Sequence, residues 1–167
     1  MDLRVTATQD GAVLDWGAGP RRAAIGPAGI AIKRGEGDNI TPIGAFPVRE
    51  IFYRADRIPR PDTALPLRAI QEDDGWCDAA NDPNYNRFVK LPYPASAETL
   101  WRDDRLYDLV LVLGYNDDPV VPGKGSAIFL HLAKPGYSAT QGCVALAYDD
   151  AVAAIEQLKP GDQVVIA

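Results

Sequence analysis

One histidine and one cysteine near the C-terminus have the residue types and the spacing of a nucleophilic catalytic pair. His131 lies in the apolar segment GSAIFLHLA and is the only histidine of the chain, while Cys143 follows a short loop in the sequence TQGCV. A thiol becomes an effective nucleophile when a nearby imidazole takes its proton. Gly142 allows the backbone to turn so that N–H groups, its own and that of Cys143, point at a developing oxyanion. The pair therefore predicts cysteine-dependent acyl transfer.

Each of these residues also has an ordinary structural alternative. A histidine on a strand can simply be half-buried and bonded to a backbone carbonyl, and a free cysteine is most often a small buried apolar side chain. A metal site is disfavoured because one histidine and two cysteines fall short of the usual four ligands, and the chain has no CxxC or HxxxH spacing. We therefore expect neither a metal nor another cofactor.

The histidine and the TQGC segment resemble the signature of the YkuD-like L,D-transpeptidase catalytic domain, a family that cross-links bacterial peptidoglycan. His131 matches the family's strand-end histidine, Thr140 its Ser/Thr, Gly142 its glycine and Cys143 its nucleophile. Further motifs resemble short, single-domain proteobacterial members and extend the similarity from about Gly26 to Ile166. These motifs are Glu36-Gly37-Asp38, Thr41-Pro42-Ile43-Gly44, Trp76-Cys77-Asp78, Tyr85-Asn86, Gly114-Tyr115-Asn116 and Gly123-Lys124-Gly125-Ser126.

The chain departs from the family pattern at three points. Gln141 stands where a second histidine is usual, and since an amide cannot take a proton, His131 is the sole candidate base. The loop between His131 and Cys143 is shorter than the common pattern. An arginine that often follows the cysteine is absent from Val144-Ala145-Leu146. The resemblance thus implies the family's chemistry with a different way of anchoring the substrate.

The activity implied is that of a peptidoglycan L,D-transpeptidase. The Cys143 thiolate would attack an L-residue of a donor stem peptide, and the thioester would pass to the diaminopimelate side-chain amine of an acceptor stem. The donor is the third stem residue in most of the family and the first stem residue in some short relatives. The length of this chain and its TQGC motif favour the first-residue donor. The alternatives are an L,D-carboxypeptidase or amidase, which gives the same thioester to water, and a non-catalytic cell-wall-binding module.

The resemblance also implies where substrate contacts lie. The family's TPxG hairpin borders its cleft, and the remaining motifs supply further polar candidates, although Arg54 could equally pair with Asp56. The backbone carbonyl that orients His131 is expected within residues 137–139. Cys77 is expected to pack beside Trp76 rather than form a disulfide. The candidate substrate contacts are Thr140, Gln141, Asn39, Thr41, Tyr85, Asn86, Asn116, Lys124, Ser126 and Arg54.

Composition favours one domain over residues 1–167 and excludes several classes of partner. A net charge of −6, with no basic stripe, argues against nucleic acid, and no apolar stretch approaches the ~20 residues of a membrane span. The first residues, MDLRVTATQDG, lack the basic and apolar segments of a secretory signal. A location in the periplasm or cell envelope is therefore expected from the substrate alone. We expect a monomer.

The elements that must position the pair are mostly strands. Segments 106–115 and 126–132 are dense in aliphatic residues, and in the second Ile128, Leu130 and Leu132 share one face while Ala127, Phe129 and His131 share the other. Residues 56–96 are rich in Pro, Asp and Asn and are expected to form long ordered loops. One helix is predicted over 149–158, followed by a strand over 163–166. The expected fold is mainly β, a YkuD-like β-sandwich or barrel with one C-terminal helix after Cys143.

Overall fold

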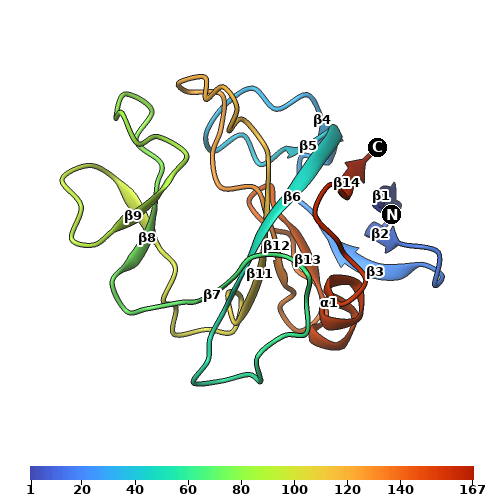
Figure 1. The fold of residues 1–167 in the computed structure, drawn as a ribbon. Coiled ribbons are helices and arrows are strands. Elements are labelled where there is room, and N and C mark those ends of the chain that lie inside the picture. Colours follow the sequence, from blue (N-terminus) through green and yellow to red (C-terminus); the bar gives the residue numbers. More distant parts are fainter.

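A long sheet that closes on itself dominates the computed structural model, which describes all residues, 1–167 (Figure 1). Its nine strands follow the order β11-β12-β13-β3-β2-β1-β14-β6-β7, and an additional pairing of β6 with β11 closes it into a barrel. This confirms the predicted mainly β, barrel-like fold. The strands are β1 (Asp2–Thr8), β2 (Gly11–Asp15), β3 (Arg21–Ala24), β4 (Ile30–Ala31), β5 (Thr41–Pro42), β6 (Gly44–Tyr53), β7 (Leu67–Ala69), β8 (Asp74–Cys77), β9 (Phe88–Lys90), β10 (Ala97–Thr99), β11 (Leu109–Leu113), β12 (Phe129–Leu132), β13 (Val144–Leu146) and β14 (Gln163–Ile166).

A smaller three-stranded sheet, with the order β10-β8-β9, stands beside the barrel (Figure 1, at the left). The prediction of long loops over residues 56–96 was therefore only partly right: most of the segment is loop, but the short strands β7, β8 and β9 lie within it. All four residues of β8 are buried, so this strand has no polar and apolar alternation to detect. Cys77 is free and fully buried in it next to Trp76, which confirms its predicted packing role.

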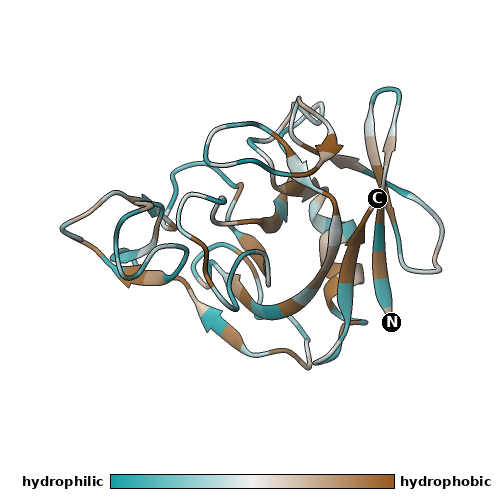
Figure 2. Cartoon of the chain, turned by 90° about the horizontal axis from the view of Figure 1, so that it is seen from above, coloured by the Kyte–Doolittle hydropathy of each residue, from teal (hydrophilic) through white to brown (hydrophobic).

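The two faces of β12 pack into two different apolar clusters. Ile128, Leu130 and Leu132 belong to the large core inside the barrel, where apolar residues follow the strands (Figure 2). Phe129 belongs to a second cluster, which also contains Trp76 and lies between the barrel and the small sheet. The predicted alternation along this strand is confirmed, and it directs His131 away from the barrel core and toward the small sheet.

The single helix, α1 (Tyr148–Ile155), follows β13 directly and packs against β11 and β12. The helix was predicted over 149–158, but it ends at Ile155 and the chain continues as a turn. Leu158 is still buried. Asp149 and Asp150 lie in the first turn, where negative charge favours the helix dipole. No helix of the structure is long and apolar enough to cross a membrane.

Candidate active site

The pairing of β12 with β13 brings His131 and Cys143 onto one face. The two strands are parallel, and their register places His131 beside Ala145. Cys143 lies two residues before Ala145, and side chains two residues apart on extended backbone point to the same side. The Phe129 N–H accordingly donates to Cys143 Sγ at 3.4 Å. Neighbouring strands thus position the imidazole and the thiol, which are separated by a loop in the sequence.

The imidazole of His131 is held through its Nδ1 atom. Nδ1 lies 2.9 Å from the carbonyl oxygen of Leu132, and because a carbonyl only accepts, Nδ1 carries the proton and Nε2 is left as the acceptor. The prediction that residues 137–139 supply this carbonyl was wrong. The reason is local: the residue after His131 turns its own carbonyl toward the ring. Tyr107 packs edge-on against the imidazole, with ring centroids 5.4 Å apart.

Burial sets the protonation state of His131. The residue is 5% exposed, and desolvation lowers its pKa from 6.5 to about 4. The Leu132 carbonyl opposes this shift but does not cancel it. At neutral pH the ring is therefore uncharged, which is the form that can accept a proton from a thiol.

The thiol of Cys143 is protonated in the resting protein. It donates to the Ala127 carbonyl at 3.2 Å, and burial raises its pKa to about 12 despite the Phe129 N–H and the charge of Lys33. No hydrogen bond joins the thiol to the imidazole, so the S–H must turn from Ala127 toward Nε2 for transfer to occur. Such contacts often tighten only when substrate is bound. The arrangement supports deprotonation during attack, in contrast to a pre-formed thiolate–imidazolium pair.

Asn86 fixes the carbonyl that holds the thiol. Ala127 has a φ of +50°, a conformation that an alanine rarely adopts. Its N–H donates to Asn86 Oδ1 at 3.0 Å, and the same oxygen accepts from Trp76 Nε1. Asn86 is only 3% exposed. The strained residue beside the thiol is thus maintained by a buried amide from the loop between β8 and β9.

The TQGC loop is shaped by Thr140. Its hydroxyl donates to the Cys143 carbonyl at 2.6 Å and accepts from the Gly142 N–H at 3.1 Å. This differs from the expectation that Gly142 offers its N–H to an oxyanion, because the threonine hydroxyl already occupies that donor. No hydrogen bond occupies the N–H of Cys143, which leaves it as the backbone donor for a tetrahedral intermediate.

Gly142 is required where its loop passes the segment between β4 and β5. Its φ is +131°, and a Cβ would lie 2.8 Å from the Ile40 carbonyl oxygen and 3.4 Å from Lys33 Nζ. Gly26 is equally constrained, since its Cβ would lie 2.1 Å from the Asn39 carbonyl oxygen and 3.2 Å from Gly142 Cα. Two glycines therefore let three backbone segments meet directly behind the thiol.

We expect Gly142→Ala to lower the free energy of unfolding by about 2 kcal/mol and turnover by roughly 10- to 100-fold, because the clash displaces the Cys143 N–H. Gly161→Ala is the matched control: Gly161 also has a positive φ, +96°, but no atom lies within 4 Å of its added Cβ. It should lose about 1 kcal/mol and no turnover. Thermal melts and initial rates measure both, and equal activity in the two variants would contradict the positioning role.

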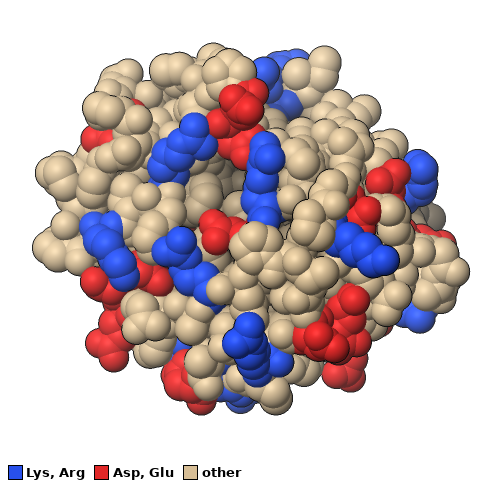
Figure 3. All heavy atoms as spheres, viewed as in Figure 1, with Lys and Arg blue, Asp and Glu red and all other residues tan.

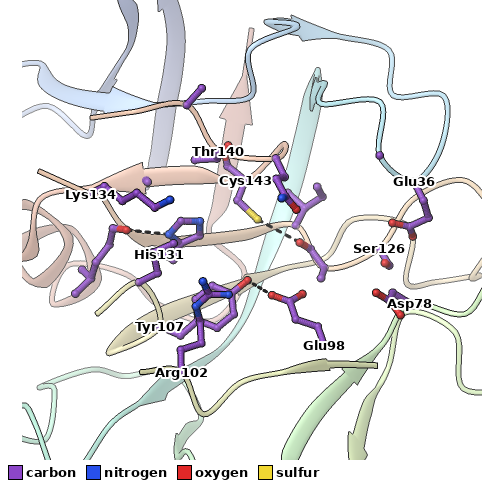
Figure 4. A pocket seen from close by; sticks show the side chains of 18 of the residues that line it. Glu36, Asp78, Glu98, Arg102, Tyr107, Ser126, His131, Lys134, Thr140 and Cys143 are labelled. Carbon is purple, nitrogen blue, oxygen red and sulfur yellow. Dashed lines mark hydrogen bonds between the residues drawn. The ribbon is translucent and has the colours of Figure 1, made fainter. Parts of the chain in front are cut away.

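His131 and Cys143 open onto one cleft of about 310 Å³ between the barrel and the small sheet. The space-filling view shows a hollow with acidic and basic side chains on its rim, and Figure 4 shows the side chains that line it (Figures 3 and 4). Most of the charged lining was not predicted from the sequence. Glu36 and Asp78 lay in quoted motifs, whereas no local pattern distinguished the others. The missed residues are Lys33, Glu36, Asp78, Glu98, Arg102, Tyr107 and Lys134.

Three of the ten candidate substrate contacts line this cleft, namely Ser126, Thr140 and Gln141. Two others support the loop from behind. Thr41 is fully buried and accepts from the Gly26 N–H, and Asn39 has a positive φ in the loop between β4 and β5.

The other five candidates lie outside the cleft lining and have structural partners. Tyr85 and Asn86 are buried, and Tyr85 Oη accepts from the Gly125 N–H. Asn116 donates to two carbonyls of the 121–125 turn, in which the Lys124 carbonyl accepts from a tyrosine hydroxyl. Arg54 pairs with Asp56 and stacks 3.5 Å from the Trp101 ring. Their polar character suggested substrate contacts, but the side chains of Tyr85, Asn86, Asn116 and Arg54 bind backbone groups of the surrounding loops, and Lys124 takes part through its backbone.

Comparison with known proteins gives one result. The family model of YkuD, described as the L,D-transpeptidase catalytic domain, matches residues 3–166. No curated protein and no solved structure matches the chain.

Proposed function

The chain belongs to the YkuD family of L,D-transpeptidase catalytic domains, and from this premise we propose that it transfers acyl groups between peptidoglycan stem peptides through a thioester on Cys143. One observation carries the proposal most directly. The His131 imidazole and the Cys143 thiol open onto the same cleft, and the imidazole is held by a hydrogen bond from its Nδ1 to the Leu132 carbonyl. This leaves Nε2 free for the thiol proton.

The first half-reaction forms the thioester. Nε2 of His131 takes the Cys143 proton as sulfur bonds to the carbonyl carbon of an L-residue in the donor stem. The N–H of Cys143 stabilises the oxyanion. The C–N bond to the following D-residue then breaks, and the imidazolium returns its proton to the departing amine.

The second half-reaction resolves the thioester. The neutral acceptor amine attacks the acyl carbon, the C–S bond breaks, and the amine's proton passes through His131 to the Cys143 thiolate. The products are a new amide cross-link and the resting thiol. Donors with the acyl group on the first or the third stem residue follow the same steps. The setting proposed for this reaction is the periplasm or cell envelope, where peptidoglycan lies.

The direct test is incubation of the pure protein with muropeptides followed by mass analysis. We expect cross-linked dimers, and sequencing of the dimers by tandem mass spectrometry identifies the donor residue. Trimmed monomers without dimers would assign the protein to hydrolysis instead, because both activities share the thioester.

A carbapenem should acylate the protein once, on Cys143, because its strained carbonyl accepts a thiolate and leaves a stable thioester. Intact-protein mass analysis should show one adduct in the wild type and in Cys77→Ala, and none in Cys143→Ala. Failure with carbapenems alone would indicate a cleft too narrow for a bicyclic drug. Failure with carbapenems, small thiol acylators and muropeptide donors together would overturn the enzymatic proposal and leave a binding module.

A further inference from the structure

The end of the cleft formed by the small sheet carries carboxylates that the chemistry above does not use. Asp78 directly follows β8, and its Oδ1 atom is completely enclosed yet has no hydrogen-bond partner. The Asp78 carboxylate forms no ion pair within 4.0 Å. A buried carboxylate oxygen without a donor is energetically costly. Asp78 lines the cleft and is only partly buried, so a donor that arrives with a ligand can reach its carboxylate.

Glu98, from β10, lies on the same side and is close to the reacting groups. Its carboxylate accepts a hydrogen bond from the Tyr107 hydroxyl, and the ring of Tyr107 contacts His131. The charge of Glu98 also acts on the Cys143 thiol. Figure 4 shows Glu98 between Tyr107 and the group formed by Asp78, Ser126 and Glu36. A group bound at Glu98 would therefore be held beside the base and the thioester.

The carboxylates at this end form no ion pair with the protein. Burial raises the pKa of Glu98, and the charges of Asp78 and Glu36 raise it further. Arg102 opposes that shift, but its guanidinium is engaged by Asp104 through two hydrogen bonds of 2.8 and 2.6 Å. Removing carboxylates from water next to one another is unfavourable unless a cation joins them. The carboxylates at this end of the cleft thus favour a positively charged ligand.

The geometry points away from a metal ion as that ligand. Nowhere in the structure do three His, Cys, Asp or Glu side chains group closely enough to hold one. A primary ammonium suits separated carboxylates better, because it is a cation with three N–H donors that diverge from one nitrogen.

We propose that Asp78 and Glu98 form a subsite for the primary ammonium of the acceptor stem, which they hold beside the Cys143 thioester. The inference rests on the proposed function, because the acceptor of that reaction is an amine that is positively charged in water. The bound ammonium releases one proton to the solvent before the neutral amine attacks the thioester. Glu36, at the mouth, adds its charge to the subsite. The subsite distinguishes an amine from water, and so favours transfer over hydrolysis.

The first test measures binding without turnover. The ligands are an acceptor stem peptide with its free side-chain ammonium and the same peptide with a hydroxyl in place of that ammonium. Calorimetric titration into Cys143→Ala protein should show that the ammonium binds at least about tenfold more tightly, because it alone gains charge-assisted hydrogen bonds. Adding Asp78→Asn or Glu98→Gln to that protein should remove the preference. Both changes keep the size of the side chain, and the amide oxygen of the glutamine can still accept from Tyr107.

The second test separates the two half-reactions in protein that retains Cys143. In Asp78→Asn, the acceptor KM should rise about tenfold or more, while thioester formation from donor alone stays within about twofold. Glu98→Gln should raise the acceptor KM by a similar factor, and its acylation rate is measured separately because the Glu98 charge also acts on the Cys143 thiol. Exposed carboxylates outside the cleft provide the matched controls, Asp62→Asn and Glu72→Gln, which should change neither quantity. Circular dichroism confirms folding of each variant.

The outcomes separate the two proposals. Slower acylation with an unchanged acceptor KM would place the ammonium on the donor stem and overturn the acceptor assignment, as would equal binding of the ammonium and hydroxyl peptides. If the wild type forms no thioester but the Cys143→Ala protein still prefers the ammonium, the proposed transfer reaction fails while the subsite stands.

Discussion

Cys143→Ala should lose transfer activity by about 10⁴-fold or more while keeping its fold, because no other group in the cleft can form the thioester. Cys143→Ser should also be nearly inactive, since a hydroxyl is far less ionised and less nucleophilic than a thiol. Initial rates of dimer formation and covalent labelling by a carbapenem measure the loss independently.

Cys77→Ala provides the internal control for the nucleophile. Cys77 is fully buried in the small sheet and does not line the cleft. Its replacement should affect stability more than turnover. The assignment would be overturned if Cys143→Ala kept its activity, or if the active protein contained a disulfide between the two cysteines.

His131→Ala should lower kcat by roughly 10²- to 10⁴-fold, the usual contribution of a general base. The pH profile of the wild type carries the more specific result. Burial lowers the pKa of His131 to about 4, so the imidazole stays neutral, and able to accept a proton, down to that pH. Activity should therefore rise with pH through an acid limb well below 6.5 and stay level through neutral pH.

The same ionisation must disappear from His131→Ala. Its residual activity should instead keep rising with pH into the alkaline range, because the pKa of the Cys143 thiol is raised to about 12 and no base assists it. Rates of thiol alkylation against pH test this directly. Gln141→Ala, which changes a cleft residue that cannot take a proton, should keep the acid limb. An acid limb near 6.5, or full activity of His131→Ala, would contradict the role of His131.

Sequence reasoning worked best where structure depends on neighbours along the chain. The alternation of residues 127–132 predicted which side chains of β12 enter the barrel core and which face outward. The apolar spacing and the acids of the first turn predicted α1 to within a few residues. The strand over 163–166 agrees with β14. Each of these elements depends on a repeating spacing of apolar residues, or on a turn, that a few consecutive residues specify.

It failed where a role depends on contacts between distant segments. Asn86 and Tyr85 have the polar character of substrate contacts, yet their side chains satisfy backbone groups of the loop before β12. The small sheet was read as loops because its strands are short and β8 is buried throughout. Neither property shows in the local pattern of polar and apolar residues.

By itself, the sequence predicted the candidate nucleophile and base, and it determined the mainly β architecture, the helix after the thiol and the glycine that the loop needs. These follow from residue types and spacings within short stretches. Only the tertiary structure decided that the Leu132 carbonyl orients the imidazole, that the resting thiol faces Ala127, and that Asp78 and Glu98 share the cleft. The physical reason is that protonation states and charge clusters depend on burial and on through-space distance. Both are set only when the small sheet packs against the barrel.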